Sequence, residues 1–119
     1  MTVPRGRELD LAGPRLEALA DPTRRALLGQ LAEEGPLSAT RLAQGRPISR
    51  QAVAKHLQLL ESVGLVTSTR SGRETRFDTC PGALRDLAGW LAAASDAWDR
   101  RLDRLAARAR ERAGERAQG

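Results

Sequence analysis

Four polar side chains that can make hydrogen bonds lie close together in the segment ISRQAVAKHLQLLESVGLV, residues 48–66. They are Arg50, Gln51, Lys55 and Gln58. Guanidinium and ammonium groups can donate to guanine O6 and N7, and a glutamine amide can pair with adenine N6 and N7. These residue types therefore suit contacts with base edges in the major groove of DNA.

Helical geometry predicts that these side chains share one face. With about 100° per residue, an arc of about 140° holds Arg50, Gln51, Ala54, Lys55 and Gln58. The opposite arc is mostly apolar and holds Ala52, Val53, His56, Leu57, Leu59, Leu60 and Val63. Ser49, at the start of the helix, can contact a phosphate together with the helix N-terminus. The alternative is an ordinary amphipathic helix with a solvated outer face.

The net positive charge is concentrated in one part of the chain. The formal charge is +5, and residues 41–76 contain seven cations and only two anions. The remainder holds equal numbers of cations and anions, so this region contains the whole excess. Such a field favours a polyphosphate partner, although chance variation of a surface would also produce it.

A β-hairpin is predicted next, in LVTSTRSGRETRFDT, residues 65–79. Its β-branched and polar residues alternate on either side of a tip at Ser71-Gly72. Arg70, Arg73 and Arg76 surround this tip and can reach backbone phosphates or a minor groove. The alternative is that these charges protect a strand edge from pairing.

Capping residues define the helices that must position these groups. Asp21 caps a helix that has Pro22 at its first position, and Ser38 and Ser49 cap two further helices. A short helix and a longer one joined by about four residues match the helix-turn-helix pattern. In this arrangement Ser38 and Thr40 are further candidate DNA contacts.

A final helix, predicted over residues 81–113, would be about 50 Å long, and this exceeds the width of a small domain. Its apolar residues would stay exposed on a single chain, so we expect them to pair two copies, with help from a short helix that begins at Pro14. Burial within one chain is the alternative. The candidate dimerisation residues are Leu16, Leu19, Leu84, Leu87, Trp90, Leu91, Trp98, Leu102 and Leu105.

The predicted fold is mainly α with a small β-hairpin, as a winged helix-turn-helix with a long C-terminal dimerisation helix. Residues 1–13 are predicted to be flexible and residues 14–113 to form the domain. Within it, residues 38–63 form the helix-turn-helix, 65–79 the wing and 81–113 the dimerisation helix. Residues 114–119 are predicted to be a disordered tail.

The chain resembles the ArsR-type (ArsR/SmtB-like) winged helix-turn-helix repressors of bacteria from about residue 16 to residue 98. The resemblance rests on Asp-Pro-Thr-Arg-Arg, on Ser-Arg-Gln-Ala-Val-Ala-Lys-His-Leu and on the Gly-Leu-Val that enters the wing. It implies a dimer that binds double-stranded operator DNA. By position it implies groove or phosphate contacts from Ser49, Arg50, Gln51, Ala54 and Lys55, and a wing contact from Arg73.

The metal-site motifs of that family are absent here. Many members release DNA on binding a metal through a Cys-x-Cys motif at the third helix, or through Asp, His and Glu on the last helix. Here the third helix reads SATRLAQ, and the last helix has no His. No cofactor is therefore expected. A weak divalent transition-metal effector, nickel or zinc, stays as an alternative through His56, Cys80 or carboxylates joined by dimerisation. A hydrogen-bonded His56 and a half-buried Cys80 are the simpler interpretations.

The sequence thus predicts a dimeric, sequence-specific transcriptional regulator, a repressor acting at a palindromic operator. The alternatives are a winged-helix module that binds an acidic protein and a metal-responsive regulator. An enzyme is not expected, because no nucleophile, base and orienting group assemble and no glycine-rich phosphate loop is present. The lone Cys, and the lack of a signal peptide or a membrane-spanning run, favour a bacterial cytoplasmic protein that joins the nucleoid when bound to DNA. An effector or accessory protein would be a further partner, and the sequence does not identify one.

Overall fold

The computed structural model of the protein describes residues 5–118, with side chains described for residues 12–115. It divides into two compact units, residues 1–87 and residues 88–119. The first unit contains the helix-turn-helix and the wing, and the second is helical. No helix among the described residues is both long enough and apolar enough to cross a membrane.

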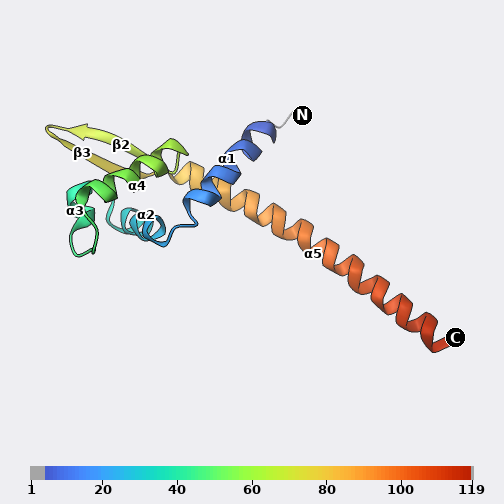
Figure 1. The fold of residues 1–119 in the computed structure, drawn as a ribbon. Coiled ribbons are helices and arrows are strands. Elements are labelled where there is room, and N and C mark those ends of the chain that lie inside the picture. Colours follow the sequence, from blue (N-terminus) through green and yellow to red (C-terminus); the bar gives the residue numbers. More distant parts are fainter. Residues whose placement is uncertain (1–4, 119) are drawn as a thin grey trace. The chain divides into compact units, whose positions relative to one another are not determined.

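The elements follow the predicted order, which Figure 1 shows along the colour ramp. Their bounds are α1 (Arg5–Ala18), α2 (Pro22–Glu34), β1 (Leu37–Ser38), α3 (Ala39–Ala43), α4 (Arg50–Ser62), β2 (Val66–Ser71), β3 (Glu74–Thr79) and α5 (Pro81–Gln118). The predicted fold class, mainly helical with a small antiparallel sheet and a long C-terminal helix, is confirmed.

The three predicted N-caps are confirmed. The side chains of Asp21, Ser38 and Ser49 each accept a backbone N–H from the residue three positions later, at 3.0, 3.1 and 3.1 Å. These bonds satisfy donors that a helix start leaves without an intrahelical partner. They therefore set where α2, α3 and α4 begin.

The sheet has one strand more than predicted. β1 pairs antiparallel with β3, and β3 pairs with β2, which gives the order β1-β3-β2. Leu37 lies opposite Phe77 and Ser38 opposite Arg76. A two-residue strand is too short to show an alternating pattern, so the sequence alone did not reveal it. Its pairing joins the start of α3 to the wing.

The wing turn lies one residue later than predicted. β2 ends at Ser71, β3 begins at Glu74, and these two residues are register partners. The connection is therefore Gly72-Arg73, with a φ of 64° at Gly72 and no positive φ at Arg73. A type II′ hairpin turn has this form, and it requires glycine at its first central position. Arg73 thus belongs to the turn itself.

The two predicted ends of the chain also differ from the structure. Helix α1 begins at Arg5 and contains Pro14, whereas the sequence predicted a flexible segment 1–13 and a helix start at Pro14. Ala12 is buried about two turns before Ala18, which is also buried, and this burial favours helix where local signals disfavour it. Helix α5 continues to Gln118, through most of the predicted tail 114–119. Residues 1–4 and 119 lie outside the described part of the chain.

One hydrophobic core holds the first unit together. The fully buried side chains come from α2, α3, α4 and β2, and Phe77 and Ala83 add β3 and the start of α5. α4 packs against α1, α2, α3 and β2, so its orientation is set by four elements. The largest buried side chains are Leu27, Leu31, Leu42, Val53, Leu57, Leu60, Leu65 and Val66.

Candidate nucleic-acid interface

Helix α4 is divided into a buried and an exposed face, largely as predicted. Val53, Leu57 and Leu60 are fully buried, one helical turn apart on the core side. The opposite side exposes polar groups, and only Ala54 on it is half-buried, a small residue that permits close approach. The exposed polar residues are Ser49, Arg50, Gln51, Lys55 and Gln58.

The apolar arc predicted for α4 was too wide. Leu59, placed on the buried arc from the sequence, is 41% exposed. It lies about 100° from Leu60 on the helix and reaches beyond the edge of the core contact. Helical periodicity shows which face is apolar, but the neighbouring elements determine how much of that face they cover.

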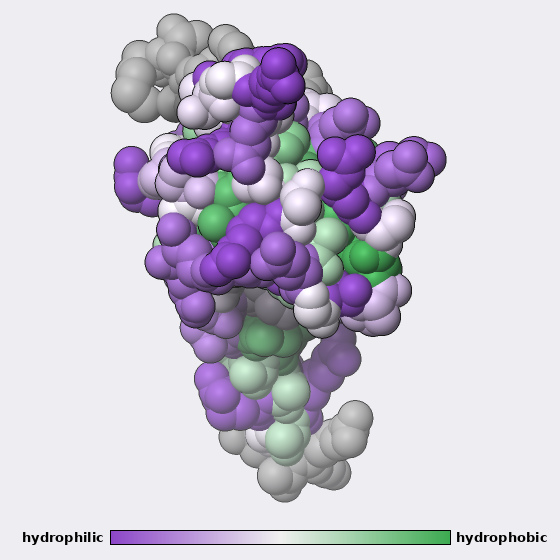
Figure 2. Space-filling view, turned by 90° about the vertical axis from the view of Figure 1, so that its left-hand side faces the viewer, coloured by the Kyte–Doolittle hydropathy of each residue, from purple (hydrophilic) through white to green (hydrophobic). Residues whose placement is uncertain are grey.

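Two hollows flank the exposed face of α4. A groove of about 630 Å³ lies between α4 and the wing, with Arg50, Ala54 and Gln58 on one side and Arg73 and Thr75 on the other. A second hollow of about 520 Å³ is lined only by the first turns of α4, including Ser49, Gln51 and Lys55. Figure 2 shows a mainly hydrophilic surface on the side of the molecule that carries α3 and the wing tip. The predicted α4 and wing residues thus meet at one surface.

The cations of this surface differ in whether an acidic side chain of the same protein neutralises their charge. Among the described residues, the one ion pair joins Arg76 Nε to Glu74 Oε2 at 2.9 Å, and both side chains are about half exposed. Arg70 Nε donates to the Gly72 carbonyl at 3.4 Å, near the limit for a hydrogen bond. Arg50, Lys55 and Arg73 have no acidic partner within the described range, and all three are exposed. Their charges are therefore available to an external anion.

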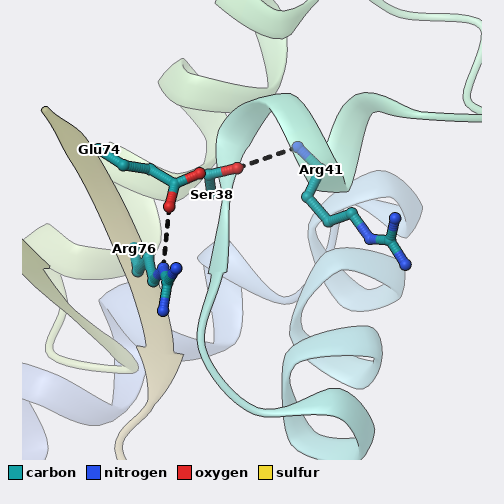
Figure 3. Close-up of polar contacts among 4 residues, drawn as sticks. All are labelled: Ser38, Arg41, Glu74 and Arg76. Carbon is teal, nitrogen blue, oxygen red and sulfur yellow. Dashed lines mark hydrogen bonds and ion pairs between the residues drawn. The ribbon is translucent and has the colours of Figure 1, made fainter. Parts of the chain in front are cut away.

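Ser38 is placed unfavourably for its predicted DNA contact. It is 9% exposed, and its Oγ accepts the Arg41 N–H at 3.1 Å, as Figure 3 shows. The side chain caps α3 beside the Glu74–Arg76 pair, so we assign it a structural role. Thr40, two residues later, is exposed and lines the groove.

Two cations counted in the basic region donate to neutral groups of the protein, Arg46 from a half-buried position and Arg41 from an exposed one. Arg46 donates from Nε to the Leu42 carbonyl at 2.8 Å and from Nη2 to Gln30 Oε1 at 2.6 Å. Arg41 donates to Gln44 Oε1 at 3.3 Å, and its guanidinium points away from the wing in Figure 3. Arg46 therefore ties α3 to α2 and does not add to the exposed charge as a free group.

The sequence did not reveal the contact that joins α4 to the wing. Ser68 Oγ donates to Glu61 Oε2 at 2.6 Å, and both residues line the groove. Glu61 lies three residues after Gln58 on the same side of α4, with Arg50 and Ala54. Its carboxylate therefore holds β2 beside the recognition helix and also places a negative charge inside the groove. No sequence motif predicted this pair, because it depends on the distance between two elements.

Arginines from α1 and α2 hold the other side of α4. Arg15 Nε donates to the Val63 carbonyl at the end of α4 at 2.8 Å. Arg24 donates to the Ala18 carbonyl at 2.6 Å, and its Nη1 lies 3.4 Å from His56 Nδ1. His56 is half-buried here, in agreement with a hydrogen-bonded packing role. The backbone N–H of Arg24 also holds the pKa of the Asp21 carboxyl below its ordinary value.

The candidate dimerisation residues fall into two groups. In the first unit Leu16, Leu19 and Leu84 are half-buried, and Leu87 is only 5% exposed. The burial of Leu87 within its own unit argues against it as a partner contact. In the second unit Trp90 is half-buried, and the four larger exposed side chains are Leu91, Trp98, Leu102 and Leu105.

The His, Cys, Asp and Glu side chains of the described residues do not converge on a metal site. The described part of the chain contains no group of three or more His, Cys, Asp and Glu side chains placed to hold a metal ion. Cys80 is a half-buried free thiol that packs against the core. A metal site built from the described residues could then form only with ligands contributed by a second copy of the chain.

Comparisons with known proteins agree with this geometry. A family model described as a helix-turn-helix domain matches residues 19–69. The HTH-type transcriptional regulator Rv2034 of Mycobacterium tuberculosis is 41% identical over 71 residues, which cover 60% of this chain and 65% of that protein. The chain thus spans slightly less than two thirds of Rv2034.

Two further relatives are covered almost completely. The HTH-type transcriptional regulator YuzN of Bacillus subtilis is 44% identical over 84 residues, which cover 63% of this chain and 89% of YuzN. The solved structure of an ArsR-like transcriptional regulator from Rhodococcus sp. RHA1 superposes with a TM-score of 0.72 at 38% identity, over 82% of this chain and 91% of that one. The chain therefore belongs to the ArsR-type (ArsR/SmtB-like) family of winged helix-turn-helix transcriptional regulators.

Proposed function

We propose that this protein binds a palindromic DNA operator as a homodimer, through α4 and the wing, and represses transcription by occupying the promoter. The observation that carries the proposal is a set of exposed cations without an ion-pair partner among the described residues: Arg50 and Arg73 line the groove, and Lys55 lines the neighbouring hollow. Transcriptional regulators of this family are not enzymes. A protein whose target is chromosomal DNA would act in the cytoplasm beside the nucleoid.

The groove side of α4 offers both kinds of DNA contact. Arg50, Gln51, Lys55 and Gln58 carry donors that can pair with base edges, and a good bidentate pair discriminates by about 1–3 kcal/mol. The half-buried Ala54 leaves room between them for a base pair. Ser49 and the N-terminus of α4 can position a phosphate. The helix can therefore read sequence while its first turn sets the register.

The arginines of the wing offer a second contact with DNA, in addition to that of α4. Arg73 lies in the turn and Arg70 at the end of β2, so both extend past the body of the unit. Arg76 is a weaker candidate, because Glu74 already compensates its charge. Guanidinium groups in this position suit the phosphates or the minor groove next to the α4 site.

The exposed apolar residues of α5 support the proposed homodimer. Leu91, Trp98, Leu102 and Leu105 form a stripe on the second unit that no described part of the chain covers. A contiguous apolar stripe of this size marks a protein interface. Two copies related by a two-fold axis would present two α4 helices to two half-sites, which matches a palindrome.

A triple variant tests the α4 surface. Replacement of Arg50, Gln51 and Lys55 by alanine should abolish sequence-specific retardation of promoter DNA in an electrophoretic mobility assay, because these groups make the base contacts. The dimer should persist in sedimentation. The matched control is the double variant Arg100→Ala with Arg110→Ala. It removes two positive charges, as the triple variant does, but from exposed positions of α5.

The control should bind DNA like the unchanged protein. Undiminished binding by the triple variant would reject α4 as the reading surface. Failure of the unchanged protein to bind any duplex at low salt would reject DNA as the partner and favour an acidic protein in its place.

A further inference from the structure

One carboxylate lies among the cations that the groove offers to DNA. Glu61 is in the last turn of α4, eleven residues after Arg50, and both side chains line the groove between α4 and the wing. Eleven residues are about three helical turns, so the two side chains lie on the same side of α4, about 16 Å apart along its axis. The groove is therefore positive at the start of the helix and negative at its end.

No cation among the described residues neutralises Glu61. Its Oε2 accepts a hydrogen bond from Ser68 Oγ at 2.6 Å, and this hydroxyl carries no charge. Glu74, the second carboxylate of the groove, is instead paired with Arg76 at 2.9 Å. Glu61 is exposed and forms no ion pair within the described range. It thus gives its end of the groove a negative charge that an approaching ligand meets.

The helix itself does not favour a carboxylate at this position. The last turn of a helix carries a partial negative charge on its carbonyl groups and therefore favours basic side chains. The last turn of α4 contains no basic residue, and Glu61 adds to the negative end of the helix dipole. A residue that departs from a local preference within a binding surface is a candidate for a functional role.

We propose that Glu61 determines DNA specificity by excluding phosphate from the end of the groove beside β2. This inference rests on the function proposed above. Binding to unrelated DNA depends almost entirely on the attraction between cations and phosphates. In such a complex a phosphate drawn toward Arg50 and Arg73 meets the carboxylate of Glu61 when it enters the groove, and this repulsion weakens the complex.

Binding to the operator depends less on the same charge. There the donors of Arg50, Gln51 and Lys55 pair with base edges, and these contacts determine where the backbone lies. The phosphates then stay outside the groove whether or not Glu61 carries a charge. The carboxylate therefore lowers the affinity for unrelated duplexes more than the affinity for the operator. The ratio of these two affinities is what decides which sites are occupied in a genome.

A conservative variant tests this inference on two duplexes. One is an operator selected from random DNA by the unchanged protein, and the other has the same length and composition in a shuffled order. Glu61→Gln removes the charge and keeps an acceptor for Ser68 Oγ. Its affinity for the shuffled duplex should rise about tenfold at low salt, because a dimer loses two exposed repulsive charges. Its affinity for the operator should change by less than about twofold. Fluorescence anisotropy titrations measure both affinities.

Two control variants separate the charge from other effects. Ser68→Ala removes the hydrogen bond and keeps the carboxylate, so it should leave the affinity for the shuffled duplex unchanged. Glu33→Gln removes a carboxylate from an exposed position of α2 that does not line the groove. It should change the affinity for the shuffled duplex much less than Glu61→Gln does, because the effect depends on position and not on net charge.

The possible results distinguish this inference from the proposed function. An equal rise for both duplexes, or no rise for the shuffled one, would overturn the role of Glu61 while operator binding stands. The same rise in Ser68→Ala would assign the effect to a displaced wing and would also overturn it. Failure of the unchanged protein to bind any duplex at low salt would reject the proposed function, and this inference with it.

Discussion

At the residue scale, arginine has two distinct roles in this protein. Arg15, Arg24 and Arg46 direct their guanidinium groups to backbone carbonyls and to polar side chains inside the first unit. Arg50 and Arg73 direct theirs outward with no acidic partner in the described chain. A planar group with five donors suits both roles, and only the local structure separates them. Net charge alone therefore overestimates the charge available to DNA.

A pH-dependent contribution to stability is expected from Asp21. Its pKa is lowered chiefly by the Arg24 N–H, so the unfolded chain binds a proton more readily than the folded one. The stabilisation is complete above the ordinary carboxyl pKa and is lost as the pH falls through the lower, folded value. The stability gap between the unchanged protein and Asp21→Asn should thus be wider at pH 7 than at pH 3 in urea unfolding.

The control for this experiment is Glu33→Gln, which removes a charge from an exposed carboxylate elsewhere on α2. It corrects for the change in net charge. A gap between Asp21→Asn and the unchanged protein that stays constant over the same pH range would contradict the assignment.

At the element scale, the N-cap residue and the buried face together determine where α4 begins and how it lies. Ser49 supplies the cap through its bond to the Ala52 N–H, and Val53, Leu57 and Leu60 anchor the helix to the core. The Glu61–Ser68 bond then fixes the distance from α4 to β2. The start of the helix and the position of the wing are thus set by separate contacts.

Two substitutions at Ser49 separate capping from DNA binding. Ser49→Ala should lower the free energy of unfolding by about 1 kcal/mol, because the Ala52 N–H loses its acceptor. Ser49→Asp keeps an acceptor and should retain stability, yet its negative charge should repel a phosphate and weaken DNA binding. Urea unfolding and mobility shift, done on both variants, measure the two effects. Equal DNA binding by Ser49→Asp and the unchanged protein would place the phosphate elsewhere.

Much of this arrangement follows from the sequence, because caps and helical periodicity act over a few residues. The caps at Asp21, Ser38 and Ser49 and the apolar side of α4 were predictable for that reason. The two-residue strand β1 and the Glu61–Ser68 bond were not, because they depend on elements distant in sequence. The buried Ser38 and the exposed Leu59 show the same limit, since periodicity does not tell how far neighbours cover a face.

At the scale of the whole molecule, the distribution of charge matters more than its total. Residues 41–76 hold the entire net charge, while the rest of the chain is balanced. Arg46 is half-buried and bonded to Leu42 and Gln30, whereas Arg41 stays exposed, so the exposed cations of this region lie on α3, α4 and the wing. The attraction to a polyanion is therefore directed at one surface.

The salt dependence of DNA affinity should report this surface directly. The slope of log affinity against log salt falls by about one for each lost phosphate contact. Arg73→Ala should thus make the slope shallower by about two units for a dimer, one from each wing. Arg100→Ala on α5 should leave the slope unchanged. Fluorescence anisotropy titrations at several salt concentrations measure both, and an unaltered slope for Arg73→Ala would remove the wing from the phosphate contacts.

The short turn of the wing fixes the reach of Arg73. With only Gly72 and Arg73 between the paired ends of β2 and β3, the guanidinium stands at a set distance from α4. Lengthening each strand by one residue would carry the tip about 3.3 Å outward and turn alternate side chains to the opposite face. If Arg73 contacts DNA as proposed, the length of the wing would thus set how far from α4 the protein reaches along the flanking nucleotides.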